Sequence, residues 1–124
     1  MNAKATARPK VIVARSWKSA GSEREPVREW LLDLLASDRK DIGGDIHRVE
    51  TEWPDVGLPL VRTLGSGLFE IRSNLVDRTA RVIFAVDDGQ MVLLHAFIKK
   101  TQATPKHDLD LARGRWDKWQ NAKK

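Results

Sequence analysis

The hydrophobic pattern of this chain changes its period at Trp53-Pro54, and that change limits the fold classes open to it. Before it, apolar side chains recur at helical spacing, at Val27, Trp30, Leu31, Leu34 and Leu35, which predicts an amphipathic helix from about residue 25 to 36. A second helix is predicted from Asp38, as its cap, to about Glu50. After the change, short apolar runs separated by turn sequences predict four strands, at residues 60–64, 68–73, 80–86 and 91–98.

The remaining elements complete an α+β chain. Val11–Ala14 is a short β-branched run typical of a strand. Thr104-Pro105 combines a capping residue with a proline suited to a first helical turn, which predicts a C-terminal helix. We therefore expect N-terminal helices packed on a small curved antiparallel sheet, followed by a C-terminal helix. Residues 1–10 are expected to form a flexible basic tail, and residues 11–124 a single domain.

Composition excludes several classes of site. The sequence contains no cysteine, so it can form neither a disulfide nor a thiolate metal site. Its three histidines are scattered, and no glycine-rich nucleotide-binding motif occurs, so we expect no metal and no cofactor. No apolar run approaches the roughly 20 residues that span a membrane, and Met1–Lys10 lacks the core of a signal peptide. A cytoplasmic protein with no membrane partner is expected.

Positive charge is concentrated at the two ends of the chain. Residues 1–18 carry five cations and no acid, and residues 95–124 carry eight cations against three acids. The region between them is acidic, with nine cations against fourteen acids. This distribution favours a polyanionic partner such as nucleic acid, although a solvated charged surface or an acidic protein partner would account for it as well.

The apolar strand that begins near Leu93 ends abruptly at Lys99-Lys100. Because the pleat of a strand fixes the direction of each side chain, these two cations are held at the rim of the sheet. Rigidly held cations are suited to binding phosphate. A double lysine that only keeps a sheet edge soluble is the alternative.

An ordered series of segments resembles one family of small proteins. The segments are Pro59–Leu64, Gly67–Arg72, Arg81–Phe84, Leu94–Gln102 and Thr104-Pro105. In this order they resemble the RelE/ParE superfamily of toxins, and most of all its HigB-like, phage-derived addiction-module killers, over roughly residues 25–120. The resemblance implies a RelE-like fold whose curved sheet carries basic residues in a cleft. It also implies the toxin of a type II toxin-antitoxin system, a metal-independent endoribonuclease that cleaves messenger RNA on the ribosome.

Several cations could stabilise the charge that develops on phosphorus during such cleavage. Strand alternation places Glu70 and Arg72 on the face opposite to Phe69 and Ile71, and Arg81 begins the next strand. By family position, Arg72 and Arg81 correspond to active-site cations, and Lys99 and Lys100 to a basic pair at the end of the last strand. The residues expected to contact RNA around them are Arg62, Glu70, Phe97 and Lys106. For Arg62, a salt bridge with Glu52 or Asp55 is the alternative.

The group that accepts the proton is less well defined, because many relatives use a tyrosine or a histidine near the C-terminus and this chain has no tyrosine. His107 lies where relatives place such a group, and its ordinary pKa near 6.5 suits proton transfer. Glu70 could act as a base or only orient Arg72. His95, in mid-strand, is better interpreted as a hydrogen-bonded core residue, and His47 is given no role.

A second functional class stays open, namely a non-enzymatic toxin of the ParE type that inhibits a topoisomerase, or a protein-binding module. Either class implies a cognate helix-turn-helix antitoxin that covers the basic cleft. In the alternative complex, the antitoxin contacts the helix that carries Trp30 and leaves the cleft open.

Overall fold

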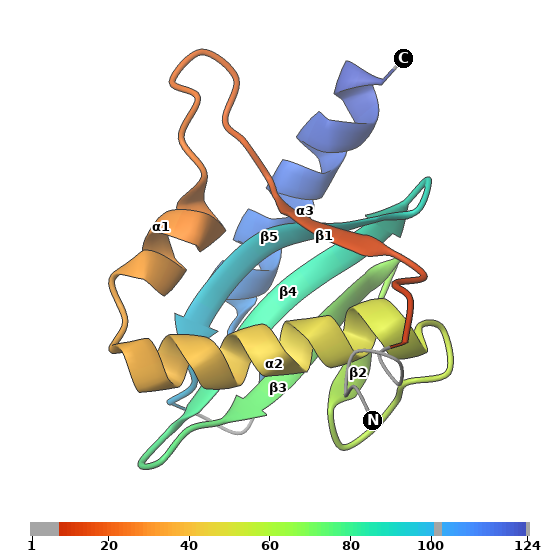
Figure 1. Cartoon of the computed structure of the whole chain (residues 1–124). Helices are drawn as coiled ribbons and strands as arrows, with labels where there is room; N and C mark the ends of the chain where they lie inside the picture. Colours follow the sequence, from red (N-terminus) through yellow and green to blue (C-terminus); the bar gives the residue numbers. More distant parts are fainter. Residues whose placement is uncertain (1–7, 101–102, 124) are drawn as a thin grey trace.

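The computed structural model describes residues 8–100 and 103–123, which form three helices around one five-stranded sheet (Figure 1). In chain order the elements are β1 (Val13–Ser16), α1 (Pro26–Leu32), α2 (Ala36–Glu52), β2 (Val61–Gly65), β3 (Leu68–Asn74), β4 (Thr79–Asp87), β5 (Gln90–Ile98) and α3 (Lys106–Ala122). The predicted basic tail falls largely on residues 1–7, outside the described part of the chain, as do Thr101 and Gln102 of the Leu94–Gln102 segment.

The sheet differs from the predicted one. Its strand order is β1-β5-β4-β3-β2, and β1 pairs with β5 in parallel while the other neighbours are antiparallel. The prediction of N-terminal helices packed on a small antiparallel RelE-like sheet is therefore wrong. The chain is α+β overall, but its sheet is mixed, has five strands and carries helices on both faces. The period change cannot indicate this arrangement, because the parallel partner of β1 lies more than 70 residues away.

A buried carboxylate holds β1 in place. Glu50, near the end of α2, is only 4% exposed. Its Oε2 accepts a hydrogen bond from the backbone amide of Ala14 at 2.7 Å and lies 3.2 Å from Lys10 Nζ. Its backbone carbonyl accepts a further bond from the amide of Val11 at 2.7 Å. The bond to Glu50 Oε2 occupies the backbone amide of Ala14, a donor on the edge of β1 that faces away from β5. In this way α2 protects that edge from pairing with another strand.

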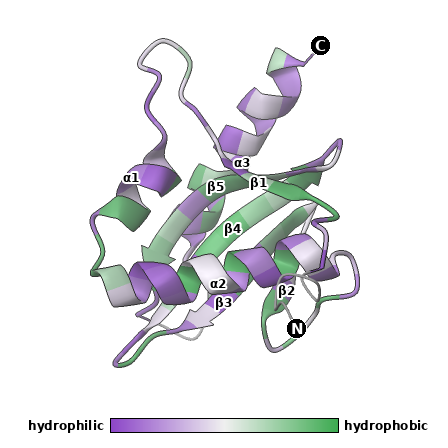
Figure 2. Cartoon of the chain, in the orientation of Figure 1, coloured by the Kyte–Doolittle hydropathy of each residue, from purple (hydrophilic) through white to green (hydrophobic). Residues whose placement is uncertain are grey.

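Helices cover the two faces of the sheet with separate hydrophobic clusters. On one face, Val27 of α1 and Ile42 and Val49 of α2 form a buried cluster with β-strand residues that include Val82 and Phe84. On the other face, Ala112 of α3 is buried with side chains that include Ile83, Val92 and Leu94. Figure 2 shows the hydrophobic central strand β4 behind α2, whose outward side is hydrophilic. The core therefore consists of two layers with the sheet between them.

The helices differ in detail from their predicted limits. The first ends at Leu32, earlier than expected, and α2 begins at Ala36. Asp38 does not cap α2. It lies buried in its first turn, where its Oδ2 is 2.9 Å from Arg78 Nη2 in the turn between β3 and β4. This ion pair joins the start of α2 to the turn between β3 and β4.

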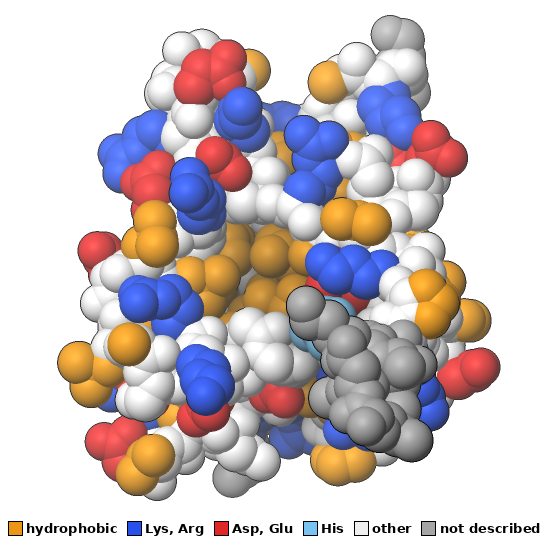
Figure 3. Space-filling model, in the orientation of Figure 1, with side chains coloured by type: hydrophobic (Ala, Val, Ile, Leu, Met, Phe, Trp, Pro, Cys, Tyr) orange, Lys and Arg blue, Asp and Glu red, His pale blue; other side chains and the backbone are white. Residues whose placement is uncertain are grey.

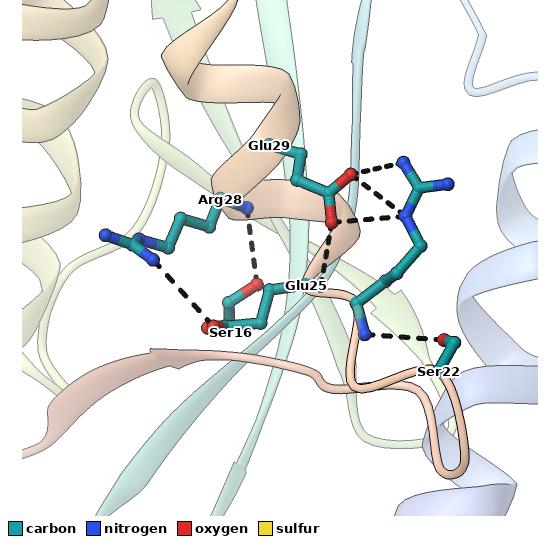
Figure 4. Close-up of polar contacts among 6 residues, drawn as sticks. Ser16, Ser22, Glu25, Arg28 and Glu29 are labelled. Carbon is teal, nitrogen blue, oxygen red and sulfur yellow. Dashed lines mark hydrogen bonds and ion pairs between the residues drawn. The ribbon is translucent and has the colours of Figure 1, made fainter.

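The start of α1 is fixed to β1 by polar contacts (Figure 4). The amide of Arg28 donates a hydrogen bond to Ser16 Oγ at 3.3 Å. The Glu29 carboxylate accepts hydrogen bonds from the amide of Glu25 at 3.1 Å and from the Arg24 guanidinium. Satisfying an amide of the first turn stabilises a helix start that lacks a capping side chain, and Glu25 provides no such cap.

The four later strands confirm the sequence prediction, since each begins and ends within one residue of the expected limits. The C-terminal helix is confirmed as well, but it starts after Pro105 and receives no capping bond from a side chain. The hydroxyl group of Thr104, predicted to cap that helix, instead bonds to a strand residue. That contact belongs to the candidate site.

Candidate functional site

Two arginines lie directly opposite each other on neighbouring strands. Arg72 on β3 and Arg81 on β4 are cross-strand partners in the antiparallel register, so both side chains project from the same face of the sheet. The register also places Glu70 opposite Ile83, a residue of the cluster under α3, which identifies the α3 face as the one that carries the arginines. Like charges at opposed positions destabilise a sheet. The structure must therefore compensate for this pair.

Glu70 supplies the compensating charge from within the core. It is fully buried, and its Oε1 lies 3.5 Å from Nε of Arg81, which is itself only 4% exposed. Its Oε2 accepts a hydrogen bond of 2.7 Å from Thr104 Oγ1. Within the described part of the chain, Glu70 Oε1 has no hydrogen-bond partner. The carboxylate thus holds Arg81 beneath the surface and ties the segment before α3 to the sheet.

A pocket opens beside the two arginines, at the end of the sheet where β4 begins and β5 ends. It has a volume of about 180 Å³ and is lined by Pro59, Arg72, Asn74, Thr79, Arg81 and Lys99. The amide of Lys99 donates a hydrogen bond of 2.8 Å to the carbonyl of Thr79, so the backbone that carries this lysine is fixed to β4. Three cationic side chains, of Arg72, Arg81 and Lys99, therefore line this one small pocket, which we call the basic pocket.

The cations in this pocket repel one another. Burial lowers the pKa of Arg81 below its ordinary value, and the charges of Arg72 and Arg62 lower it further, against the opposing effect of Glu70. The pKa of Lys99 is also below its ordinary value, first through burial and then through the charges of Arg81 and Arg72. One carboxylate faces four cations, so a bound anion would relieve their repulsion. The pocket is electrostatically suited to a phosphate.

The structure separates the predicted lysine pair. Lys99 lines the pocket with the arginines, whereas Lys100 is exposed and lines another cavity, of about 490 Å³, with Trp30, Phe97 and Pro105. Consecutive residues in extended backbone point in opposite directions, which accounts for the separation. The catalytic role predicted for Lys100 therefore has no support from its position.

The other predicted RNA-contacting and catalytic residues do not line the pocket. Arg62 is exposed on β2, opposite Glu70, and Glu52 pairs with Arg48 instead of with it. Phe97 lies opposite Arg81 on β5. Lys106 and His107 are exposed in the first turn of α3, and Lys106 Nζ lies 2.6 Å from Asp110 Oδ2. Neither lines the pocket, so their roles, and those of Arg62 and Phe97, stay predictions.

A histidine–carboxylate pair lies on the same face and was not predicted. His95 Nε2 is 2.6 Å from Asp108 Oδ1 on α3, both side chains are 16% exposed, and the imidazole stacks on Phe97. Burial lowers the pKa of His95, and this effect outweighs the opposite influence of Asp108. The interpretation of His95 as a hydrogen-bonded residue is confirmed. The sequence could not identify its partner, because the contact joins a strand to a helix.

The lowered pKa of His95 predicts a pH dependence of stability. The unfolded chain, with an ordinary histidine pKa near 6.5, binds more protons than the folded one, so the free energy of unfolding rises with pH. This contribution is complete above the unfolded pKa and is lost as the pH falls toward the folded one. In denaturant titrations between about pH 7.5 and about pH 5.5, His95→Gln is expected to lose less stability than the wild type. Equal losses in the wild type and in His95→Gln would contradict this account.

Residues 8–100 and 103–123 contain neither a candidate metal site nor a helix that could span a membrane. No group of three or more histidine, aspartate or glutamate side chains there could hold a metal ion. No helix in the same residues is both long and apolar enough to cross a membrane.

Comparison with models of known protein families identifies a family that this chain matches. Residues 29–117 match the family model described as phage-derived protein Gp49-like (DUF891). The match extends from α1 to α3 and includes every strand that borders the basic pocket. No curated protein sequence matches the chain.

Proposed function

Because this chain belongs to the Gp49-like family of phage-derived proteins, we propose that it is the toxin of a toxin-antitoxin system and that it cleaves messenger RNA on the ribosome. The single observation that carries the proposal is the pocket in which Arg72, Arg81 and Lys99 meet. Cations fixed around one position can stabilise a phosphate whose charge increases during reaction. The resemblance to HigB-like toxins supports the choice of ribosome-bound message as the substrate.

In the proposed reaction, the ribose 2′-hydroxyl attacks the adjacent phosphorus and the bond to the 5′-oxygen breaks. The products are a 2′,3′-cyclic phosphate and a 5′-hydroxyl. Arg72 and Lys99 bind the non-bridging phosphate oxygens from the walls of the pocket. Arg81 approaches them from below and is held there by Glu70. These preorganised cations stabilise the negative charge that the attack adds to those oxygens.

Proton transfer requires a second group. We assign Glu70 to positioning Arg81, because it is buried, paired with that arginine and bonded to Thr104, and a nearby cation makes a carboxylate a weaker base. His107 is our candidate for accepting the 2′-hydroxyl proton, and water supplies the proton that the departing 5′-oxygen takes up. The assignment is supported by the resemblance, in which relatives place such a group near this position, and by the exposure of His107 at the start of α3.

The proposal predicts a salt dependence of RNA binding. With a 2′-O-methyl RNA that cannot be cleaved, the logarithm of affinity should fall linearly with that of salt concentration, with a slope of about −0.7 for each phosphate neutralised. Arg72→Ala should make the slope less steep by up to about 0.7. Lys40→Ala, an exposed residue of α2 on the other face of the sheet, should leave it unchanged. Equal slopes in all three proteins would count against a phosphate in this pocket.

A non-enzymatic toxin that inhibits a topoisomerase is the alternative that the resemblance also supports. Primer extension on ribosome-bound message after induction of the chain distinguishes the two. Discrete new ends support the nuclease. Intact message together with loss of DNA supercoiling activity supports the alternative.

A toxin of this kind requires an antitoxin, and we propose a helix-turn-helix partner that covers the basic pocket. The opposite face offers a second position, since Figure 3 shows a hollow floored by hydrophobic side chains among α1, α2 and β1. Ala14, Leu31 and Leu93 line a cavity of about 190 Å³ there, with Arg15 and Arg28 beside them. If Lys99→Ala and Lys100→Ala together leave complex formation unchanged, the partner contacts the α1 face and leaves the pocket open.

A further inference from the structure

A second cavity adjoins the edge strand β2 and differs in character from the basic pocket. Its volume is about 450 Å³, within the range of about 300–1,000 Å³ that is usual for small-molecule sites. Trp53 and Phe69 line it with rings that meet edge to face at 5.0 Å, and both rings are only partly buried. Leu58, also in the lining, is 67% exposed. Two partly open aromatic rings thus lie in an accessible apolar pocket.

The aromatic pocket and the basic pocket lie on opposite faces of the sheet, because Phe69 packs with the cluster under α2 whereas Arg72 and Arg81 project toward α3. The two pockets approach each other at the segment before β2. Leu58 lines the first and its neighbour Pro59 lines the second. Arg62, in the lining of the aromatic pocket, lies opposite Glu70, which pairs with Arg81 of the basic pocket. The charge of Arg62 also acts on Arg81 and Lys99. The guanidinium of Arg62 therefore stands at the boundary between an aromatic cavity and a cluster of cations.

We propose that the aromatic pocket binds a nucleobase of the RNA strand whose phosphate occupies the basic pocket. This inference rests on the proposed function and adds to it a means of selecting single-stranded RNA. Unstacked bases of single-stranded RNA are held by aromatic side chains and by guanidinium planes, and Trp53, Phe69 and Arg62 provide both. A base stacked within a duplex could not enter the pocket, so the pocket selects for unpaired message.

The test compares two oligomers of equal length and charge, a six-residue single-stranded 2′-O-methyl RNA and a ribose-phosphate oligomer without bases. The wild type should bind the RNA about tenfold more tightly than the base-free oligomer. Leu58→Glu, which places a charge in the exposed mouth of the pocket, should remove most of that preference. Val76→Glu is the matched control, because Val76 is 91% exposed in the turn between β3 and β4, and it should keep the preference.

Tryptophan fluorescence gives a second readout, because Trp53 lines the aromatic pocket. RNA should quench the tryptophan fluorescence of the wild type more than that of Trp53→Phe, whereas the base-free oligomer should quench neither. Equal affinity of the wild type for both oligomers would overturn the base pocket and leave the proposed nuclease intact. Failure to bind either oligomer would overturn both proposals. If Leu58→Glu keeps the preference for RNA and loses only the antitoxin, the pocket binds a protein segment and the inference is wrong.

Discussion

Arg81→Ala is expected to reduce the rate of message cleavage by about 10²- to 10³-fold, the usual effect of removing one preorganised donor from a developing anion. It is also expected to lower the free energy of unfolding by about 3–5 kcal/mol, because it leaves the buried carboxylate of Glu70 without its partner. Cleavage is measured by single-turnover assays on programmed ribosomes, and stability by denaturant titration. Both properties fall together because one guanidinium lines the pocket and also pairs with Glu70.

A double variant separates these two effects. Replacing Arg81 with methionine and Glu70 with leucine exchanges a buried ion pair for apolar side chains of similar size, a change that is often neutral or stabilising. We expect Arg81→Met with Glu70→Leu to regain the stability lost in Arg81→Ala, while cleavage stays about 10²- to 10³-fold slower than in the wild type. Cleavage at the wild-type rate by a stable double variant would show that the pocket is not where the reaction occurs.

Lys99→Ala is expected to reduce cleavage by about 10²-fold, whereas Lys100→Ala should change it by less than about threefold, the effect expected of a screened charge outside the site. The two residues are adjacent and chemically identical, so each is a matched control for the other. The expected difference in cleavage arises only from the direction of the two side chains, because Lys99 lines the pocket with Arg72 and Arg81 and Lys100 does not. Assays of both variants at one salt concentration check it.

Equal losses in the two lysine variants would contradict this assignment. They would indicate that the end of β5 attracts RNA only through its total charge. If both lysine variants kept full activity, Lys99 would not belong to the site, and Arg72 and Arg81 would be its remaining cations.

Local pattern was sufficient to predict β2 to β5. Alternating side chains and short turns are properties of neighbouring residues, and antiparallel hairpins join strands that are adjacent in sequence. The same logic placed Arg72 on the face away from Phe69 and Ile71. The pairing of Arg72 with Arg81 follows from the antiparallel register of β3 and β4.

Tertiary contacts accounted for what the sequence did not predict. The position of β1 depends on β5 and on Glu50 of α2, both distant along the chain, so hydrophobic period could not indicate a mixed sheet. Thr104 is a good capping residue by type, but its hydroxyl group bonds to Glu70 across the fold. Likewise, Lys100 could be separated from Lys99 only once the direction of the backbone beyond β5 was known.

The central claim is that the basic pocket on the α3 face cleaves an RNA phosphodiester through its own 2′-hydroxyl. Analysis of the fragment ends produced by the purified chain on translating ribosomes tests it most directly. We expect upstream fragments that end in a 2′,3′-cyclic phosphate and downstream fragments that begin with a 5′-hydroxyl, both formed about 10²- to 10³-fold more slowly by the stable Arg81→Met, Glu70→Leu variant. Intact message, or fragments that end in a 3′-hydroxyl, would contradict the account.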